Sequence, residues 1–219
     1  MLEKLQEKFE QAAKQAEVYN RKLDETFKDP LARQTSWKPV ERGGSSGRSR
    51  TLKQINPTRL EFKAAPLTLV LAGLAIAVGI LVALTGFIGA GSADWNRVVI
   101  SIPLTAAGLF FWFQLTRPAI LDKQTGFYWV GRNAPASPSA AREQANATML
   151  SDVGAVQVIA EDVRTERGRT FRSFEINLVL YDGSRLNLVD HAKLSVIKAD
   201  AQRVAEFLQV PLWDASELI

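Results

Sequence analysis

Two apolar runs decide the fold of this chain: PLTLVLAGLAIAVGILVALTGFI (residues 66–88) and VVISIPLTAAGLFFWFQL (residues 98–115). Neither run contains a charged residue. A helix needs roughly 20 residues to cross a hydrocarbon core of about 30 Å, and two such helices in tandem are hard to bury in a protein of this size. We therefore expect a two-helix transmembrane hairpin over residues 66–117, with helices 66–89 and 98–116 and a loop at 90–97.

Small residues on the first run predict how the two helices pack. Ala75, Gly79 and Ala83 stand four apart, which places them on one helical face where another helix can approach closely. The second run is the expected partner, because a short loop makes the two helices antiparallel neighbours. Trp95 and Trp112 fit the aromatic belts at the two membrane interfaces.

The positions of Lys and Arg predict the orientation of the hairpin. Six of the 27 basic residues lie between Arg42 and Lys63, the loop holds Arg97 alone, and Arg117, Lys123 and Arg132 follow the second run. By the positive-inside rule both termini should be cytoplasmic. The same placement indicates that the net charge of +4 reflects a membrane flank, and we expect no nucleic-acid partner.

Composition excludes several chemistries. The chain has no Cys and a single His, which removes disulfides, thiol catalysis and a histidine metal cluster within one chain. The apolar runs contain no ionisable residue that would mark a proton relay or ion path. We predict no catalytic, cofactor-binding or metal-binding residues and no cofactor, and we expect that the first run, far from Met1, is not a cleavable signal peptide.

Residues 1–28 are predicted to form an amphipathic, coiled-coil-like helix. Its apolar residues are spaced alternately three and four apart, as a heptad seam requires. Either the helix binds a partner or a second copy of the chain, or it docks on its own chain. If a partner is bound, the predicted contact residues are Leu2, Leu5, Phe9, Tyr19 and Leu23, together with Trp37 in the next segment.

Residues 29–65 are predicted to be a basic cytoplasmic linker. Asp29-Pro30 should stop the preceding helix, because the residue before Pro is disfavoured in the α region. The Gly43-Gly-Ser-Ser-Gly47 stretch lacks the Gly-Lys-Ser/Thr ending of a phosphate-binding loop, so we interpret it as flexible chain, with Trp37 as an anchor point. Leu52 to Phe62 could hold a short extended piece interrupted at Pro57.

Residues 118–219 alternate in the manner of strands and are predicted to form a small α+β domain. We expect strands at Ala119–Asp122, Phe127–Val130, Val153–Val163, Phe174–Tyr181 and Arg185–Val189, with a loop over Gly131–Thr148. From Leu194 the period becomes helical, which predicts a helix that ends before Pro211 and covers one sheet face, with Trp213 folding back. The fold class is thus a membrane α-helical hairpin with an antiparallel sheet of about five strands, one C-terminal helix and an N-terminal amphipathic helix.

Two groups of polar residues in this domain are of types that can form a site. Asp190 precedes the C-terminal helix and is predicted to be its N-cap, and we interpret His191 as structural, because no nucleophile or metal partner stands near it in sequence. Arginines flank a predicted hairpin tip, where they are either a solvated loop or a contact for anionic headgroups: Arg164, Arg167, Arg169 and Arg172.

Several motifs together resemble a known group of proteins. These are Ser173–His191, Ala201–Trp213, Asp29-Pro30, Trp37 with Pro39, Gly43-Gly44, Asn56-Pro57 and Arg59–Phe62. The chain resembles a group of uncharacterised bacterial two-pass inner-membrane proteins whose soluble end looks like a truncated pleckstrin-homology-like domain. The resemblance implies a fold and a location in the inner membrane, but no activity.

The sequence therefore predicts a non-enzymatic, membrane-anchored scaffold or regulatory subunit that presents cytoplasmic surfaces to a protein partner or to a second copy of itself. A lipid-headgroup-sensing or lipid-processing membrane protein is the alternative. An enzyme would require clustered ionisable residues at one depth, and a channel would require several copies around a pore.

Overall fold

The computed structural model describes residues 6, 14, 17–40, 43–47, 50–88, 94–165 and 168–218. The chain forms two compact units, one from residues 1–48 with 149–219 and the other from residues 49–148. The segment expected to be a linker, residues 29–65, is divided between them. Each unit is described separately.

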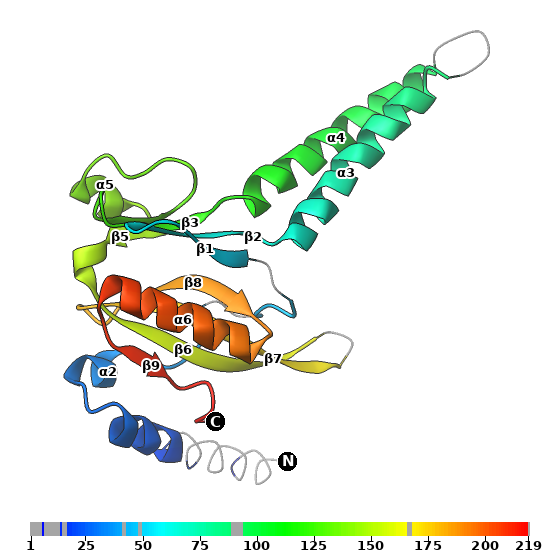
Figure 1. The fold of residues 1–219 in the computed structure, drawn as a ribbon. Coiled ribbons are helices and arrows are strands. Elements are labelled where there is room, and N and C mark those ends of the chain that lie inside the picture. Colours follow the sequence, from blue (N-terminus) through cyan, green and yellow to red (C-terminus); the bar gives the residue numbers. More distant parts are fainter. Residues whose placement is uncertain are drawn as a thin grey trace. The chain divides into compact units, whose positions relative to one another are not determined.

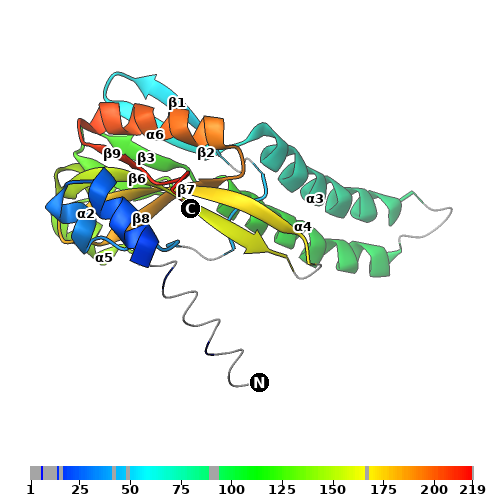
Figure 2. The same cartoon turned by 90° about the horizontal axis from the view of Figure 1, so that it is seen from below.

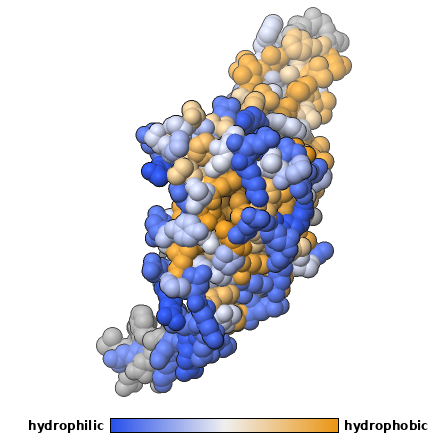
Figure 3. All heavy atoms as spheres, turned by 60° about the vertical axis from the view of Figure 1, so that its left-hand side comes forward, coloured by the Kyte–Doolittle hydropathy of each residue, from blue (hydrophilic) through white to orange (hydrophobic). Residues whose placement is uncertain are grey.

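The unit of residues 49–148 contains the two long apolar helices, α3 (Pro66–Thr85) and α4 (Trp95–Leu115). They lie side by side along their length in both views (Figures 1 and 2). Both are long and apolar enough to cross a membrane, and only 11% of the apolar window of each is buried in the structure. Figure 3 shows the helix pair as an almost continuous hydrophobic surface.

Small residues form the contact between α3 and α4. Gly79 on α3 and Ser101 and Gly108 on α4 are buried there, and a Cβ added at Gly108 would lie 2.9 Å from the backbone nitrogen of Ile76. Of the face expected from sequence, Gly79 lies in the contact and the backbone of Ala75 lies close to Gly108, although Ala75 as a whole residue is exposed. Close backbone approach is thus made possible by glycine at the two tightest points.

Helix α4 begins earlier than the charge pattern indicated. We expected its first residue at 98, but Asp94 is its N-cap and its side chain accepts a hydrogen bond from the backbone N–H of Asn96 at 3.2 Å. Arg97 lies in the first turn and pairs with Asp94 at 3.0 Å. Asp is a favoured N-cap residue. The cap at Asp94 starts the helix before Asn96 and Arg97, which the sequence pattern had placed in the loop.

A five-stranded sheet in the order β1-β2-β3-β4-β5 completes this unit. Its strands are β1 (Arg50–Asn56), β2 (Arg59–Ala64), β3 (Ala119–Asp122), β4 (Phe127–Val130) and β5 (Ala147–Met149). Strands β3 and β4 have the predicted bounds, and Gly126 in their turn has a φ of 78°, which favours glycine. The expected linker supplies β1 and β2, and the expected loop 131–148 contains a short helix, α5 (Pro138–Glu143), capped by Ser137.

Two neighbouring strands of this sheet lead directly into the apolar helices. β2 runs into α3 and α4 runs into β3, and Phe62 of β2 pairs with Ala119 of β3. Their pairing is antiparallel, so the first turn of α3 and the last turn of α4 are held together by the ladder. The sheet thus defines the geometry at the base of the helix pair.

The other unit is built on a four-stranded sheet in the order β8-β7-β6-β9. Its elements are β6 (Val153–Arg164), β7 (Thr170–Leu180), β8 (Arg185–His191), helix α6 (Leu194–Leu208) and β9 (Leu212–Asp214). The strands expected from Val153 onward and the C-terminal helix are present with small shifts in their ends. The single antiparallel sheet expected over residues 118–219 is wrong, because β3 and β4 belong to the sheet of the other unit and β9 joins this sheet in parallel. After α6, Gln209 adopts a left-handed conformation as C-cap, and Trp213 is buried on β9, which pairs with β6 in parallel.

Both faces of this sheet are covered. Side chains alternate between the faces of a strand, and Ala155, Val179 and Trp213 form a core cluster with Phe27 and Leu31 from the N-terminal part of the chain. Helix α6 packs on β6 and β7 (Figure 1). It covers the other face of the sheet, opposite to the face that carries Ala155 and Val179. The segment expected to be linker is therefore partly a structural layer of this unit.

Candidate partner-binding site

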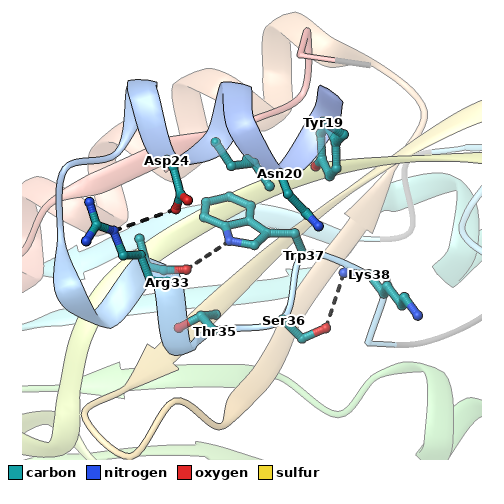
Figure 4. A pocket seen from close by; sticks show the side chains of 10 residues that line it. Tyr19, Asn20, Asp24, Arg33, Thr35, Ser36, Trp37 and Lys38 are labelled. Atoms are coloured by element: carbon teal, nitrogen blue, oxygen red, sulfur yellow. Dashed lines mark hydrogen bonds and ion pairs between the residues drawn. The ribbon is translucent and has the colours of Figure 1, made fainter. Parts of the chain in front are cut away.

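A hollow of about 590 Å³ lies between the N-terminal helix, described over residues 17–26, and the segment that follows it. Figure 4 shows its wall around the indole ring of Trp37. The lining residues are Tyr19, Asn20, Leu23, Asp24, Ala32, Arg33, Thr35, Ser36, Trp37 and Lys38. We call this feature the Trp37 hollow.

A sharp change of direction in the chain creates the hollow. The N-terminal helix ends at residue 26, and Asp29-Pro30 begins a second, short helix, α2 (Pro30–Gln34). The Asp29 side chain accepts a hydrogen bond from the N–H of Leu31 at 2.9 Å, and Pro occupies the first helical position, where its missing N–H costs nothing. Asp29-Pro30 was expected only to stop a helix, but it also starts one.

Trp37 is held firmly in the wall. Its ring stacks on Phe27 with centroids 5.0 Å apart and an interplanar angle of 11°, and it lies 6.0 Å from the ring of Trp213. The indole N–H donates to the carbonyl of Ala32 at 3.0 Å. The prediction of Trp37 as an anchor point agrees with these contacts.

The rim of the hollow is polar. Asp24 and Arg33 approach to 3.7 Å across it, and both side chains are more than half exposed, so this pair contributes little to stability. The Tyr19 hydroxyl is buried and has no hydrogen-bond partner among the described residues. Burial raises the pKa of Tyr19 above its ordinary value.

The predicted partner-binding residues have different fates. Leu2, Leu5 and Phe9 lie outside the described residues. Leu23 is buried in a core cluster with Ile159 and Ala215, so it lies on the side of the helix that docks on its own chain. Tyr19 and Trp37 are half-buried and line the Trp37 hollow, where they could still contact a partner.

From Thr35 onward the chain forms a strap, residues 35–40 and 43–47, that lies along β6 and β7. The carbonyl of Ser36 accepts from Gln157 at 3.2 Å, and the N–H of Ser45 donates to the Ser173 hydroxyl at 2.8 Å. A side chain at Gly44, whose φ is +43°, would collide with Ser173. Glycine is therefore required where the strap approaches the sheet most closely.

A buried polar network lies under the strap. Asn177 donates to Gln157 at 3.2 Å and to Glu175 at 2.8 Å, Arg185 donates to Gln157 at 3.0 Å, and the N–H of Val40 donates to Glu175 at 2.8 Å. Burial, with the negative charge of Asp190, raises the pKa of Glu175, and the hydrogen bonds and Arg185 oppose this only in part. Burial also lowers the pKa of Arg185.

Sequence reasoning missed this network. Glu175 and Asn177 alternate with apolar residues on β7, a pattern that usually indicates a solvated face. The overlooked signal was Val179 on the same face, which would have been exposed to water without a covering segment.

The predicted N-cap of the C-terminal helix is wrong. The N-cap position of α6 is Lys193, and no side chain caps it. Asp190 lies at the end of β8 and accepts a hydrogen bond from Asn187 at 2.8 Å. The neighbouring His191 is buried, and its Nδ1 accepts from the N–H of Lys193 at 2.7 Å, so the histidine rather than the aspartate organises the entry to α6.

The arginine cluster lies at the β6–β7 hairpin tip, as predicted. Arg164 pairs across the ladder with Thr170, and Arg172 pairs with Asp162 at 3.3 Å. Arg164 and Arg169 are exposed, and Arg167 lies outside the described residues. Contact with anionic headgroups stays a prediction for these side chains.

Comparison with models of known protein families finds no match, and comparison with curated proteins finds none either. The resemblance to two-pass membrane proteins is thus carried by the sequence motifs alone. Within the described part of the chain, no group of three or more His, Cys, Asp or Glu side chains is arranged to hold a metal ion.

Proposed function

We propose that this protein is a non-enzymatic scaffold or regulatory subunit, anchored in a bacterial inner membrane by α3 and α4, which presents the Trp37 hollow to a protein partner in the cytoplasm. The observation that carries the binding role is the Trp37 hollow itself. It combines a rigidly held indole with a half-buried phenol and a charged rim. Trp, Tyr and Arg are the residues that most often dominate binding at protein interfaces.

The surface of the two helices supports the anchor. Large side chains on both helices are exposed, including Leu71 and Leu81 on α3 and Phe110 and Phe111 on α4, each more than half exposed. Exposed apolar area of this extent marks a membrane or protein contact. A soluble core helix of the same composition would be mostly buried, unlike α3 and α4.

Charge supports the orientation with both termini cytoplasmic. Basic residues lie on the strands that adjoin the base of the helix pair, and the far end has Arg97 paired with Asp94. Positive residues concentrate on the cytoplasmic side of membrane helices. The hollow would then face the cytoplasm with the rest of its unit.

A second candidate function is headgroup sensing at the β6–β7 tip. Arg164 and Arg169 are exposed there on a tight turn, in which the Thr165 hydroxyl donates to the Arg169 carbonyl at 3.0 Å. Each basic residue near an anionic surface contributes about 1 kcal/mol. This candidate predicts that the double substitution Arg164→Gln with Arg169→Gln weakens the association of the β6–β7 tip with anionic vesicles.

The partner-binding proposal is tested with two matched charge insertions. Asn20 lines the hollow and is exposed. Gln202 is an exposed polar residue on α6, which covers the opposite face of the sheet from the N-terminal segment. Asn20→Arg should block the hollow, whereas Gln202→Arg adds the same charge elsewhere. Tagged full-length variants are purified from native membranes in mild detergent, and co-purifying proteins are quantified.

A stoichiometric partner retained by the parent and by Gln202→Arg, but lost at least ten-fold in Asn20→Arg, is the expected result. Equal recovery of the partner in both variants would move the binding surface away from the hollow. No stoichiometric partner in any sample, together with turnover of a lipid or nucleotide by the purified protein, would overturn the scaffold proposal.

A further inference from the structure

A pocket of about 320 Å³ lies at the base of the helix pair, within the unit of residues 49–148. It is lined by Glu61, Lys63, Ala64, Leu69, Thr116, Pro118 and Arg132. Its volume is at the lower end of the roughly 300–1,000 Å³ that small-molecule sites occupy. We call it the basal pocket.

The local fold brings distant residues to this pocket. Strand β2 supplies Lys63 just before α3, and Thr116 follows the last residue of α4. Gly131 has a φ of 130°, and its N–H donates to the carbonyl of Pro118 at 2.8 Å, which turns the chain after β4. This turn places Arg132 against the end of α4.

Arg132 is one of two exposed cations that line the pocket, with Lys63. It donates to the Thr116 hydroxyl at 3.0 Å, and its guanidinium carbon lies 5.1 Å from the centre of the Phe113 ring. No carboxylate lies within ion-pair distance of Arg132 among the residues that the structure describes. A guanidinium has five N–H donors, and Thr116 accepts from one of them.

The one acidic residue that lines the pocket, Glu61, is already paired with two cations. Glu61 is buried and approaches Arg59 at 2.7 Å and Lys63 at 2.9 Å. Burial alone would raise its pKa, but the hydrogen bonds and charges of Lys63 and Arg59 outweigh burial and lower the pKa below its ordinary value. Glu61 is thus ionised and paired, and among the pocket-lining residues one negative charge faces two positive ones.

A purely structural role for Arg132 would be to complement the negative end of the α4 dipole. That role requires only the contact through Thr116, whose hydroxyl in turn donates to the carbonyl of Trp112 at 2.6 Å. It does not explain a pocket that combines a second cation with apolar walls from Leu69 and Pro118.

We propose that the basal pocket binds the phosphate of an anionic phospholipid, with Arg132 and Lys63 as the cationic contacts and Thr116 beside them. The proposal rests on the membrane insertion of α3 and α4 proposed above. An arginine fork matches the geometry of phosphate oxygens, and basic pockets at the cytoplasmic ends of membrane helices recognise lipid headgroups in this way.

The position of the pocket favours a lipid over a soluble anion. Leu69 lies in the first two turns of α3, and the exposed ring of Phe113 lies in the last turn of α4 beside Arg132. A lipid whose phosphate sits at Arg132 would have its glycerol and acyl chains next to these apolar side chains. Inorganic phosphate would gain nothing from that part of the wall.

The test uses the full chain in mild detergent, titrated with phosphatidylglycerol or with phosphatidylcholine, with bound lipid counted by native mass spectrometry. Arg132→Gln and Lys63→Gln are each expected to weaken phosphatidylglycerol binding about five-fold. Arg132→Lys keeps the charge without the fork and should bind more tightly than Arg132→Gln. Arg142→Gln, on the exposed side of α5, is the matched control and should bind like the parent.

Other outcomes would overturn the proposal. Equal binding of the two lipids by the parent, or equal losses in Arg132→Gln and Arg142→Gln, would show that the pocket has no headgroup role. Displacement of phosphatidylglycerol by inorganic phosphate at millimolar concentration would identify a soluble-anion site instead.

Failure of the anchor is measured separately. Each variant is expressed and its membranes are washed with alkaline carbonate, which removes peripheral proteins. Retention of every variant with no lipid preference overturns only the headgroup site, whereas extraction of the parent overturns the membrane insertion on which the site depends. Unchanged circular dichroism of Lys63→Gln and Arg132→Gln shows that a loss of lipid is not a loss of fold.

Discussion

Truncating two side chains in the core under α6 should strongly destabilise the unit built on the four-stranded sheet. Leu178 on β7 and Val204 on α6 both have 0% of their surface exposed. A buried Leu→Ala change costs about 2–5 kcal/mol, and Val→Ala removes two carbon atoms at about 0.8 kcal/mol each plus a cavity term. Leu178→Ala with Val204→Ala is therefore expected to cost about 4–7 kcal/mol, much of the ~5–15 kcal/mol that stabilises a typical domain.

Hydrogen exchange of the full chain in detergent micelles measures this loss. Since 1.4 kcal/mol is a factor of ten, the amides of α6 should exchange about 10³–10⁵-fold faster in the double variant. Leu180→Ala is the matched control, because Leu180 is only partly buried and its loss should accelerate exchange by roughly ten-fold or less. Exchange in the double variant within ten-fold of the parent would refute the assignment of this core.

His191→Ala should lower the free energy of unfolding by about 1 kcal/mol or more and Asp190→Ala by less, because His191 accepts the Lys193 N–H; the reverse order in denaturant titrations would contradict the corrected cap. Glu175 has a raised folded-state pKa, so its contribution to stability is full below its unfolded pKa and is lost as the pH rises through the folded value. Glu175→Gln should accordingly flatten the fall of stability with pH above the ordinary pKa of a glutamate, and an unchanged slope would refute this. Cys introduced at residue 92 should react with an impermeant thiol reagent in intact cells and Cys at Ser139 should not, since the chain has no other Cys; the opposite labelling would invert the topology.

Most of the secondary structure could be predicted because it depends on local patterns. The charge-free runs became α3 and α4, the alternation from Val153 onward became β6 to β8, and the period change at Leu194 became α6. Asp182-Gly183, between the strands expected at Phe174–Tyr181 and Arg185–Val189, forms a turn with a φ of 81° at Gly183. Each of these signals lies within a few residues of the structure it determines.

The candidate sites were less predictable because they join residues far apart in sequence. Trp37 was expected to be an anchor point, but the hollow around it requires the turn at Asp29-Pro30 and the docking of Leu23 on Ile159. The basal pocket joins Lys63 with Arg132, which no periodicity relates. The cap assigned to Asp190 was wrong because β8 continues through His191 before α6 begins.

The sequence by itself determined the two apolar helices, the strand-rich C-terminal part and the basic flank of the helix pair, because length, hydropathy and charge act through local chemistry. Only the tertiary structure decided that the expected linker supplies β1 and β2 and a strap on β6 and β7. Strand pairing and strap docking are long-range contacts. The free energy of such contacts depends on which buried partners the chain brings together, and no single segment carries that information.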